Sequence, residues 1–164
     1  MFLISCNKDT LKDINPMEKV VESISDATTE APLLPEGPTW NDEYIELVNT
    51  HRRDLGLRAL QVSPYIDLAA LDHSQKMADK TIPFGHTGSA TRCSLIINAI
   101  GSGNLCGEIV ASGYKTPQSV FEGWIKSPTH KSKIENTRYT HTGLGFAKNS
   151  TGVIYWTQIF LEVN

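Results

Sequence analysis

Apolar residues recur at three- and four-residue intervals along much of the chain, which predicts amphipathic helices over residues 41–56, 63–80, 91–100 and 116–126. Three helix starts carry a hydroxyl residue followed by proline. The hydroxyl can cap the first turn, and proline fits the first helical position. These starts are Ser63-Pro64, Thr116-Pro117 and Ser127-Pro128, the last predicting a further short helix.

Strand patterns are concentrated in the second half of the chain. The expected strands cover residues 108–112, 144–148 and 153–163, the last rich in β-branched and aromatic residues. Asn149 to Gly152 has the composition of a hairpin turn between the last two strands. Helices, one strand, more helices and a closing hairpin predict an α+β fold, layered α-β-α, with a mostly antiparallel sheet.

The first 38 residues differ in composition from the rest. They carry three basic and seven acidic residues, a net charge of −4, whereas the remaining 126 carry twelve and eleven, a net charge of +1. Three prolines, at positions 32, 35 and 38, end this segment. We expect residues 1–38 to be a flexible linker, with a short helix over 16–25, and residues 39–164 to be one folded domain.

Several classes of protein are excluded or disfavoured. No apolar run approaches the ~20 residues of a membrane-spanning helix. A formal net charge of −3 argues against nucleic acid as a partner. Glycine-lysine phosphate loops, dinucleotide-binding fingerprints and serine-hydrolase elbows are absent from the sequence.

The chain opens with Leu3-Ile4-Ser5-Cys6, which resembles a bacterial lipoprotein cleavage box with Cys6 as the lipidated residue. The basic segment and longer apolar segment that normally precede such a box are missing. Either the true start lies upstream or the likeness is chance. The first reading predicts a membrane anchor through Cys6.

Cys93 and Cys106 both fall within the folded domain. A disulfide between them would suit an oxidising compartment and stabilise the fold by roughly 3 kcal/mol. Two buried reduced thiols are the alternative.

Two residues are candidates for chemistry on separate segments. His86 lies between Gly85 and Gly88 in a loop, where an imidazole is exposed. Glu108 enters a strand that we expect to be central in the sheet, and a carboxylate there needs a partner. A surface histidine and a fold-stabilising glutamate are the plainer interpretations.

His130 is expected in the first turn of the helix that Ser127 begins. The helix dipole disfavours the imidazolium there, and a neutral imidazole suits metal binding or general-base catalysis. Ser127, His130 and Glu108 could form a nucleophile-base triad, although a serine at such a position is normally a helix cap.

Several segments together resemble the CAP superfamily of cysteine-rich secretory, antigen 5 and pathogenesis-related 1 proteins, in its bacterial SCP-like branch. The segments span residues 49–56, 69–78, 85–88, 106–109, 123–134, 142–145 and 155–158. The resemblance covers about residues 40–164. It implies a three-layer α-β-α sandwich in an extracytoplasmic protein, secreted or lipid-anchored at the cell surface or in the periplasm.

The resemblance also implies a surface cleft where two histidines and two acidic residues converge, often around a divalent metal. His86 matches the first histidine and Glu108 the glutamate, although Ile109 replaces the usual asparagine. Tyr155 falls where the second histidine belongs, and no acidic residue lies between Lys80 and Glu108. We expect His130 to face the cleft, so that His86, Glu108 and His130 could hold Zn²⁺, with Ser127 and Tyr155 at the margin.

The leading hypothesis is a monomeric, non-enzymatic CAP-domain module whose cleft binds a small ligand, lipid, peptide or cell-wall component. One alternative is a hydrolase of peptide or cell-wall material that uses His86, Glu108, His130 or Ser127. The other is a surface adhesion module with a vestigial cleft.

Overall fold

The structure is a computed structural model that describes residues 39–164. The predicted linker, the helix over residues 16–25 and the lipidation of Cys6 lie outside the described residues. None of the helices in the described part is long and apolar enough to cross a bilayer.

Every helix predicted within residues 39–164 is present. The helices are α2 (Trp40–Asp54), α3 (Pro64–Ala78), α4 (Ser89–Ile100), α5 (Pro117–Lys126) and α6 (Pro128–Ile134). Thr39 and Thr116 form capping boxes that satisfy the first N–H groups of α2 and α5. Ser63 and Ser127 make no side-chain cap hydrogen bond, so these two starts rely on proline at the first helical position.

The strands are β1 (Gln61–Val62), β2 (Leu105–Ser112), β3 (His141–Lys148) and β4 (Ile154–Glu162), in the sheet order β1-β3-β4-β2. Only β1, which the sequence pattern does not predict, is parallel to its neighbour. The Asn149–Gly152 turn joins β3 and β4 as expected. The expectation that the strand carrying Glu108 is central is wrong, because β2 pairs with β4 alone and forms an edge.

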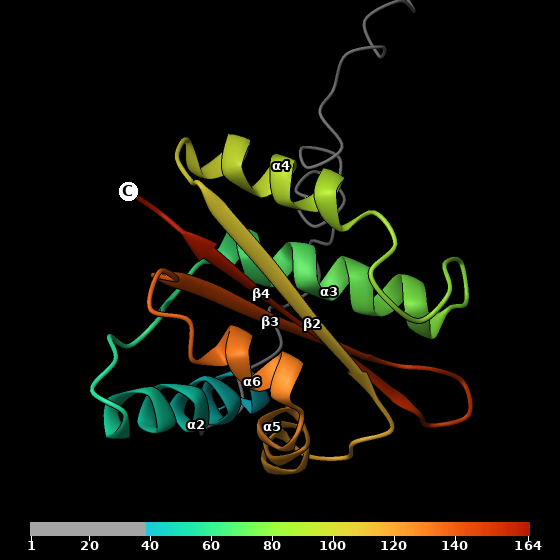
Figure 1. Ribbon diagram of the computed structural model, residues 1–164. Coiled ribbons are helices and arrows are strands. Elements are labelled where there is room, and N and C mark those ends of the chain that lie inside the picture. The colour runs from blue at the N-terminus through green and yellow to red at the C-terminus, as the bar shows by residue number, and fades with distance from the viewer. Residues whose placement is uncertain (1–38) are drawn as a thin grey trace, which may run out of the picture. The chain divides into compact units, whose positions relative to one another are not determined.

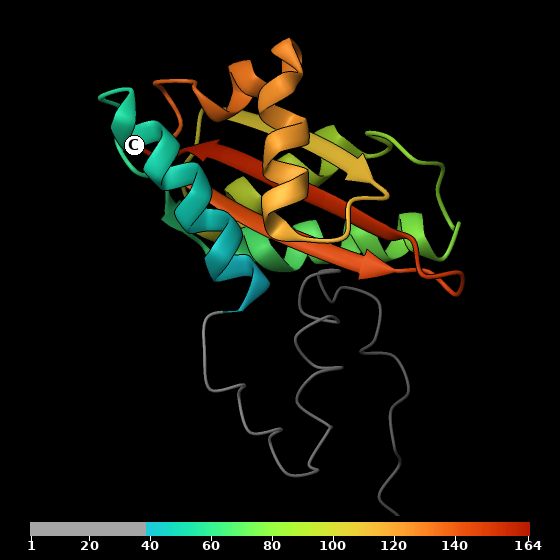
Figure 2. The same cartoon turned by 90° about the horizontal axis from the view of Figure 1, so that it is seen from below.

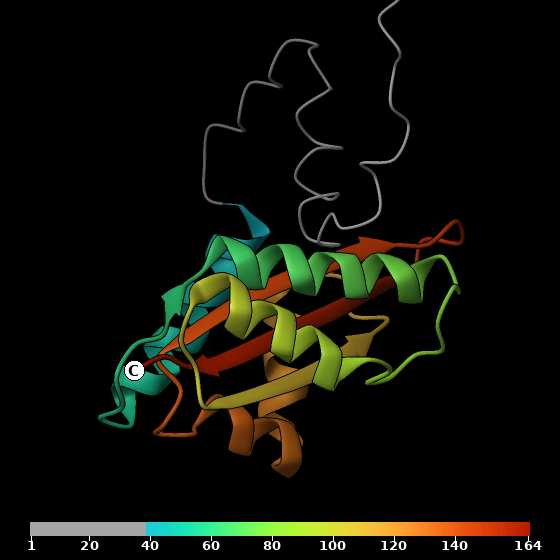
Figure 3. The same ribbon diagram turned by 90° about the horizontal axis from the view of Figure 1, so that it is seen from above.

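Helices cover both faces of the sheet, which confirms the three-layer α-β-α sandwich. Figure 2 shows α2, α5 and α6 on one face, and Figure 3 shows α3 and α4 on the other. Each face has its own apolar core. The first is centred on Tyr44, Trp124, Trp156 and Phe160, and the second on Ile66, Ala70, Ile96 and Ile159.

Two glycines of β3 allow α3 to lie directly on the sheet. A Cβ at Gly143 would overlap the backbone of α3 at Asp67, and one at Gly145 would overlap it at Leu71. Ser74 completes this contact by donating a hydrogen bond to the Gly145 carbonyl at 3.0 Å. The backbone of α3 therefore sits closer to β3 than any side chain on these two residues would permit.

Replacing Gly145 with alanine should destabilise the fold by at least about 2–3 kcal/mol, because α3 must move away from β3. Gly152→Ala is the control, since a Cβ there meets nothing within 4 Å and costs only about 1–2 kcal/mol for its positive φ. Chemical denaturation of both variants measures the difference. Equal losses would contradict the close-packing argument.

Asp67 joins the same two elements through a partly buried carboxylate. Its Oδ1 accepts a hydrogen bond from the Leu144 N–H of β3 at 2.8 Å. Burial raises the pKa of Asp67 to about 6, and this outweighs the hydrogen bond from Leu144, which lowers the pKa. The folded protein therefore binds this proton more tightly than the unfolded chain does.

The free energy of unfolding should consequently fall as pH rises from about 3.8 to about 6. Asp67→Asn keeps the acceptor oxygen and removes the charge, so this variant should be more stable than the parent by about 1–2 kcal/mol at pH 7. The advantage should vanish below pH ~4. Denaturation at several pH values tests this, with Asp72→Asn as the control, because that carboxylate is 43 % exposed. An advantage independent of pH would contradict the prediction.

Candidate functional site

The candidate site is built around Glu108, in the middle of β2. Although β2 is an edge strand, the Glu108 side chain is only 5 % exposed. A carboxylate so far removed from water requires charged or hydrogen-bonding partners. The residues that supply them come from α3, from the loop at residues 84–88 and from α4.

Arg92 of α4 provides the counter-charge. Its Nε and one terminal nitrogen donate to Glu108 Oε2 at 2.9 and 2.6 Å. Another Arg92 nitrogen donates to the Thr87 carbonyl at 3.2 Å and so ties the loop to the same guanidinium. The Arg92 side chain is 12 % exposed, so this is a largely buried ion pair.

His86 occupies the other carboxylate oxygen. Its Nδ1 donates to Glu108 Oε1 at 2.8 Å, while the imidazole itself stays 52 % exposed. A carboxylate that accepts a hydrogen bond from Nδ1–H fixes the orientation of the ring. The other nitrogen, Nε2, is then left to contact a ligand or solvent. The predicted pair of His86 and Glu108 is therefore in direct contact.

His73 of α3 lies beneath this pair and is fully buried. Its Nε2 donates to the Gly85 carbonyl at 2.9 Å and lies 3.8 Å from Glu108 Oε1. Burial, reinforced by the nearby positive charge of Arg92, lowers the pKa of His73. A neutral His73 thus supports the loop that carries His86.

His130 and Ser127 share one hollow with His86. This hollow of about 530 Å³ is also lined by Phe84, Val110, Ser112, Tyr114 and Trp124. Burial, and secondarily the proximity of His86, lowers the pKa of His130. Tyr155 does not line the hollow, but its ring packs 6.2 Å from that of Phe84, at the margin.

A second hollow of about 390 Å³ lies on the other side of His86. It is lined by Ser89, Ala90, Gly107 and Lys133 together with Glu108 and the two cysteines. Cys93 and Cys106 are joined by a disulfide, which links α4 to β2 directly beside Arg92 and Glu108. Of the two arrangements that the sequence leaves open, the structure has the disulfide.

The donor set does not fit a metal ion. Within residues 39–164, no group of three or more histidine, cysteine, aspartate or glutamate side chains is arranged to hold one. The guanidinium of Arg92 contacts the carboxylate that the predicted zinc site requires. A fixed cation next to Glu108 disfavours a second one.

The predicted serine-histidine-glutamate triad is not assembled either. Ser127 Oγ lies 3.2 Å from Thr129 Oγ1, and Glu108 contacts His86 and Arg92. His130 is placed in the hollow beside Ser127, but no hydrogen bond joins their side chains in the described part of the chain.

Sequence reasoning missed Arg92. It is the only lysine, arginine, aspartate or glutamate between Lys80 and Glu108, and it lies in an otherwise uncharged helical stretch. The need of a buried glutamate for a counter-charge would have singled it out. The role of His73 had no comparable signal, because its partner is a backbone carbonyl.

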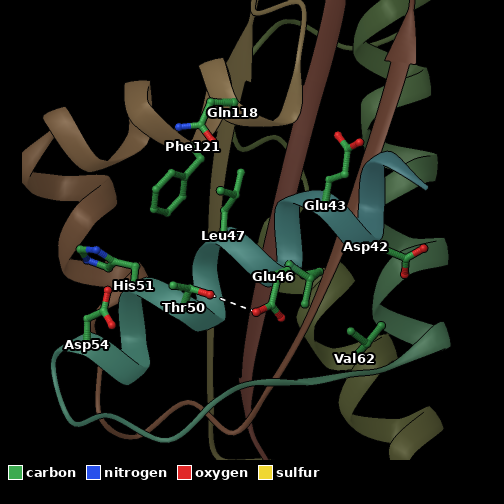
Figure 4. A pocket seen from close by; sticks show the side chains of 11 residues that line it. Asp42, Glu43, Glu46, Leu47, Thr50, His51, Asp54, Val62, Gln118 and Phe121 are labelled. Carbon is green, nitrogen blue, oxygen red and sulfur yellow. Dashed lines mark hydrogen bonds between the residues drawn. The ribbon is translucent and has the colours of Figure 1, made fainter. Parts of the chain in front are cut away.

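A larger hollow, of about 880 Å³, lies along α2 (Figure 4). It contains none of the predicted site residues. Carboxylates from α2 surround it, and one of them, Glu46, accepts a hydrogen bond from Thr50. His51 at its end is paired with Glu135 at 2.8 Å. Histidines and carboxylates therefore occur in both places, but only the β2 site has a buried ion pair.

Removing one partner of that ion pair should be costly. Arg92→Met should destabilise the protein by about 3–5 kcal/mol because Glu108 is left as an unpaired buried charge. The double variant Arg92→Met/Glu108→Gln should lose at least about 1 kcal/mol less than the sum of the two single losses. Denaturation of all four proteins completes this cycle, and additive losses would show that the pair is not coupled.

Comparison with known proteins agrees with the fold and with the sequence resemblance. Residues 45–160 match the family model for the cysteine-rich secretory protein family, CAP. The Bacillus subtilis protein YkwD is 31 % identical over 139 residues, which cover 84 % of this chain and 52 % of YkwD. The B. subtilis membrane protein YlbC is 26 % identical over 128 residues, 76 % of this chain and 35 % of YlbC. The chain thus matches about half or less of each curated relative.

Solved structures show the same fold. An outer surface protein from Borrelia burgdorferi superposes with a TM-score of 0.64 at 24 % identity, over 73 % of this chain and 90 % of that one. An extracellular SCP-domain protein from Bacillus anthracis superposes with a TM-score of 0.63 at 22 % identity. The superposition covers 80 % of this chain and 45 % of that one. With the family match and the α-β-α sandwich, these likenesses establish that the chain belongs to the cysteine-rich secretory protein (CAP) family.

Proposed function

We propose that this protein is a non-enzymatic, extracytoplasmic CAP-domain module that binds a ligand in the cleft around His86 and His130. The observation that carries the proposal is that both carboxylate oxygens of Glu108 already accept hydrogen bonds from other side chains. One of its oxygens is engaged by His86 and the other by Arg92, so the carboxylate is committed to holding side chains in position. What faces solvent is an oriented imidazole suited to recognition.

The lack of an activated nucleophile supports binding over turnover. Ser127 is engaged with Thr129, and no base contacts its hydroxyl among residues 39–164. Nucleophilic catalysis requires a base within hydrogen-bond reach of the attacking group. An anchor through Cys6 and a linker over residues 1–38 would hold such a module at the cell surface.

The test uses the full chain with two probes, a mixture of casein-derived peptides and purified muropeptides. We expect no new products by mass spectrometry, and retention of at least one component in equilibrium dialysis. His86→Ala and His130→Ala should each weaken retention roughly tenfold, as expected for the loss of a buried polar contact. His141→Ala, a histidine that lines neither hollow, is the matched control.

Turnover of either probe that disappears in His86→Ala would overturn the proposal. Unchanged retention in both cleft variants would overturn it as well and would favour an adhesion module with a vestigial cleft.

A general-base hydrolase is the second candidate, because the lowered pKa of His130 favours the neutral imidazole that a base requires. His130 would take a proton from water. A metal-assisted form of this mechanism is not proposed, because the donor set around Glu108 does not fit a metal ion. Elemental analysis of protein purified without an affinity tag or added metal should therefore find no stoichiometric ion.

A further inference from the structure

The outer side of β2 is an unpaired row of backbone groups. Gly113 N–H donates to the Ile154 carbonyl at 2.9 Å, and the antiparallel register continues from there along β2 and β4. Hydrogen-bonded pairs alternate with non-hydrogen-bonded pairs in such a ladder. The odd-numbered residues of β2 therefore bond to β4, and the N–H and C=O groups of Cys106, Glu108, Val110 and Ser112 point away from the sheet.

One contact verifies this assignment. The Val110 carbonyl accepts a hydrogen bond from Trp124 Nε1 at 3.4 Å, which requires it to face outward from β4. Within residues 39–164, no other hydrogen bond reaches the outward groups of Glu108, Val110 or Ser112. Three N–H donors and two C=O acceptors on this edge are left without a partner.

The two hollows of the candidate site follow this same edge. The smaller is lined by Cys106, Gly107 and Glu108, and the other by Val110, Ala111 and Ser112. His86 lines both. Figure 1 shows β2 with α4 along one side of the strand and α5 and α6 along the other. The two hollows together with the strand edge that they follow form the proposed cleft.

We propose that this cleft binds an extended polypeptide segment, which adds to the edge of β2 as a further strand. This inference rests on the proposed binding function and names the ligand class. Another strand presents N–H and C=O groups at the spacing of the free row and would satisfy them. An acyl chain would cover the same polar groups without satisfying them, which costs free energy.

The shape and charge of the cleft limit the partner further. Helices α4 on one side and α5 and α6 on the other flank this edge (Figure 1), which favours a single strand over the edge of a second sheet. His86, His130 and Lys133 line the cleft, whereas its one acidic residue, Glu108, is already paired with Arg92. A segment with an acidic side chain beside Lys133 would be favoured, and the imidazoles of His86 and His130 would offer it hydrogen bonds.

Ser112 allows a backbone test. Its side chain is exposed, and its N–H points outward, so proline there removes one free donor without breaking the ladder to β4. The probe is a phage-displayed library of random dodecapeptides selected on the full chain. Synthetic versions of the selected peptides are then measured against Ser112→Pro and against Ser112→Ala, which keeps the N–H.

We expect acidic peptides whose affinity falls at least roughly fivefold in Ser112→Pro and less than twofold in Ser112→Ala. N-methylation of the peptide should abolish binding at alternate residues only, a result that does not depend on how Ser112→Pro folds.

Failure to select any peptide, or equal tolerance of N-methyl groups at successive residues, would overturn strand addition. Peptides that bind Ser112→Pro normally but lose affinity in His86→Ala would overturn it too, while leaving the proposed binding function intact.

Discussion

A buried carboxylate, Glu108, determines how the site is assembled. At 5 % exposure it needs a counter-charge, and Arg92 supplies it from α4 while His86 occupies its second oxygen. The disulfide joins the residues next to this ion pair, Cys93 and Cys106, 13 positions apart. Covalent and electrostatic links thus connect the same two elements, so α4 is fixed on β2 where its arginine reaches the carboxylate.

The packing of α3 on β3 supports the site from the other direction. Gly143 and Gly145 let the helix backbone approach the strand, and this position buries His73. The imidazole of His73 then holds the Gly85 carbonyl, one residue before His86. The position of His86 is therefore fixed by two contacts. Glu108 binds its ring, and His73 binds the backbone of the preceding residue, Gly85. A loop with glycines at positions 85 and 88 would otherwise sample many conformations.

Local patterns in the sequence predicted the helices well, because proline starts and apolar spacing act within a few residues. The family resemblance predicted one cleft for His86, Glu108 and His130. In the structure His86 lines one hollow with Glu108 and another with His130. Local patterns could not predict the edge position of β2 or the two-residue strand β1, because strand order depends on pairing between distant segments. Arg92 was missed because its partner is 16 residues away and on another element.

An open strand edge is normally a hazard, because any extended chain can pair with it. Here α4 lies on one side of the edge of β2 and α5 and α6 lie on the other (Figure 1). His86 lines both hollows beside this edge. Flanked in this way, the edge is expected to be more accessible to a single strand than to the edge of a second sheet. The charged and aromatic side chains around the edge would then restrict which strand binds. An open strand edge, which most folds must cover, can in this way serve as a binding site that selects its partner strand.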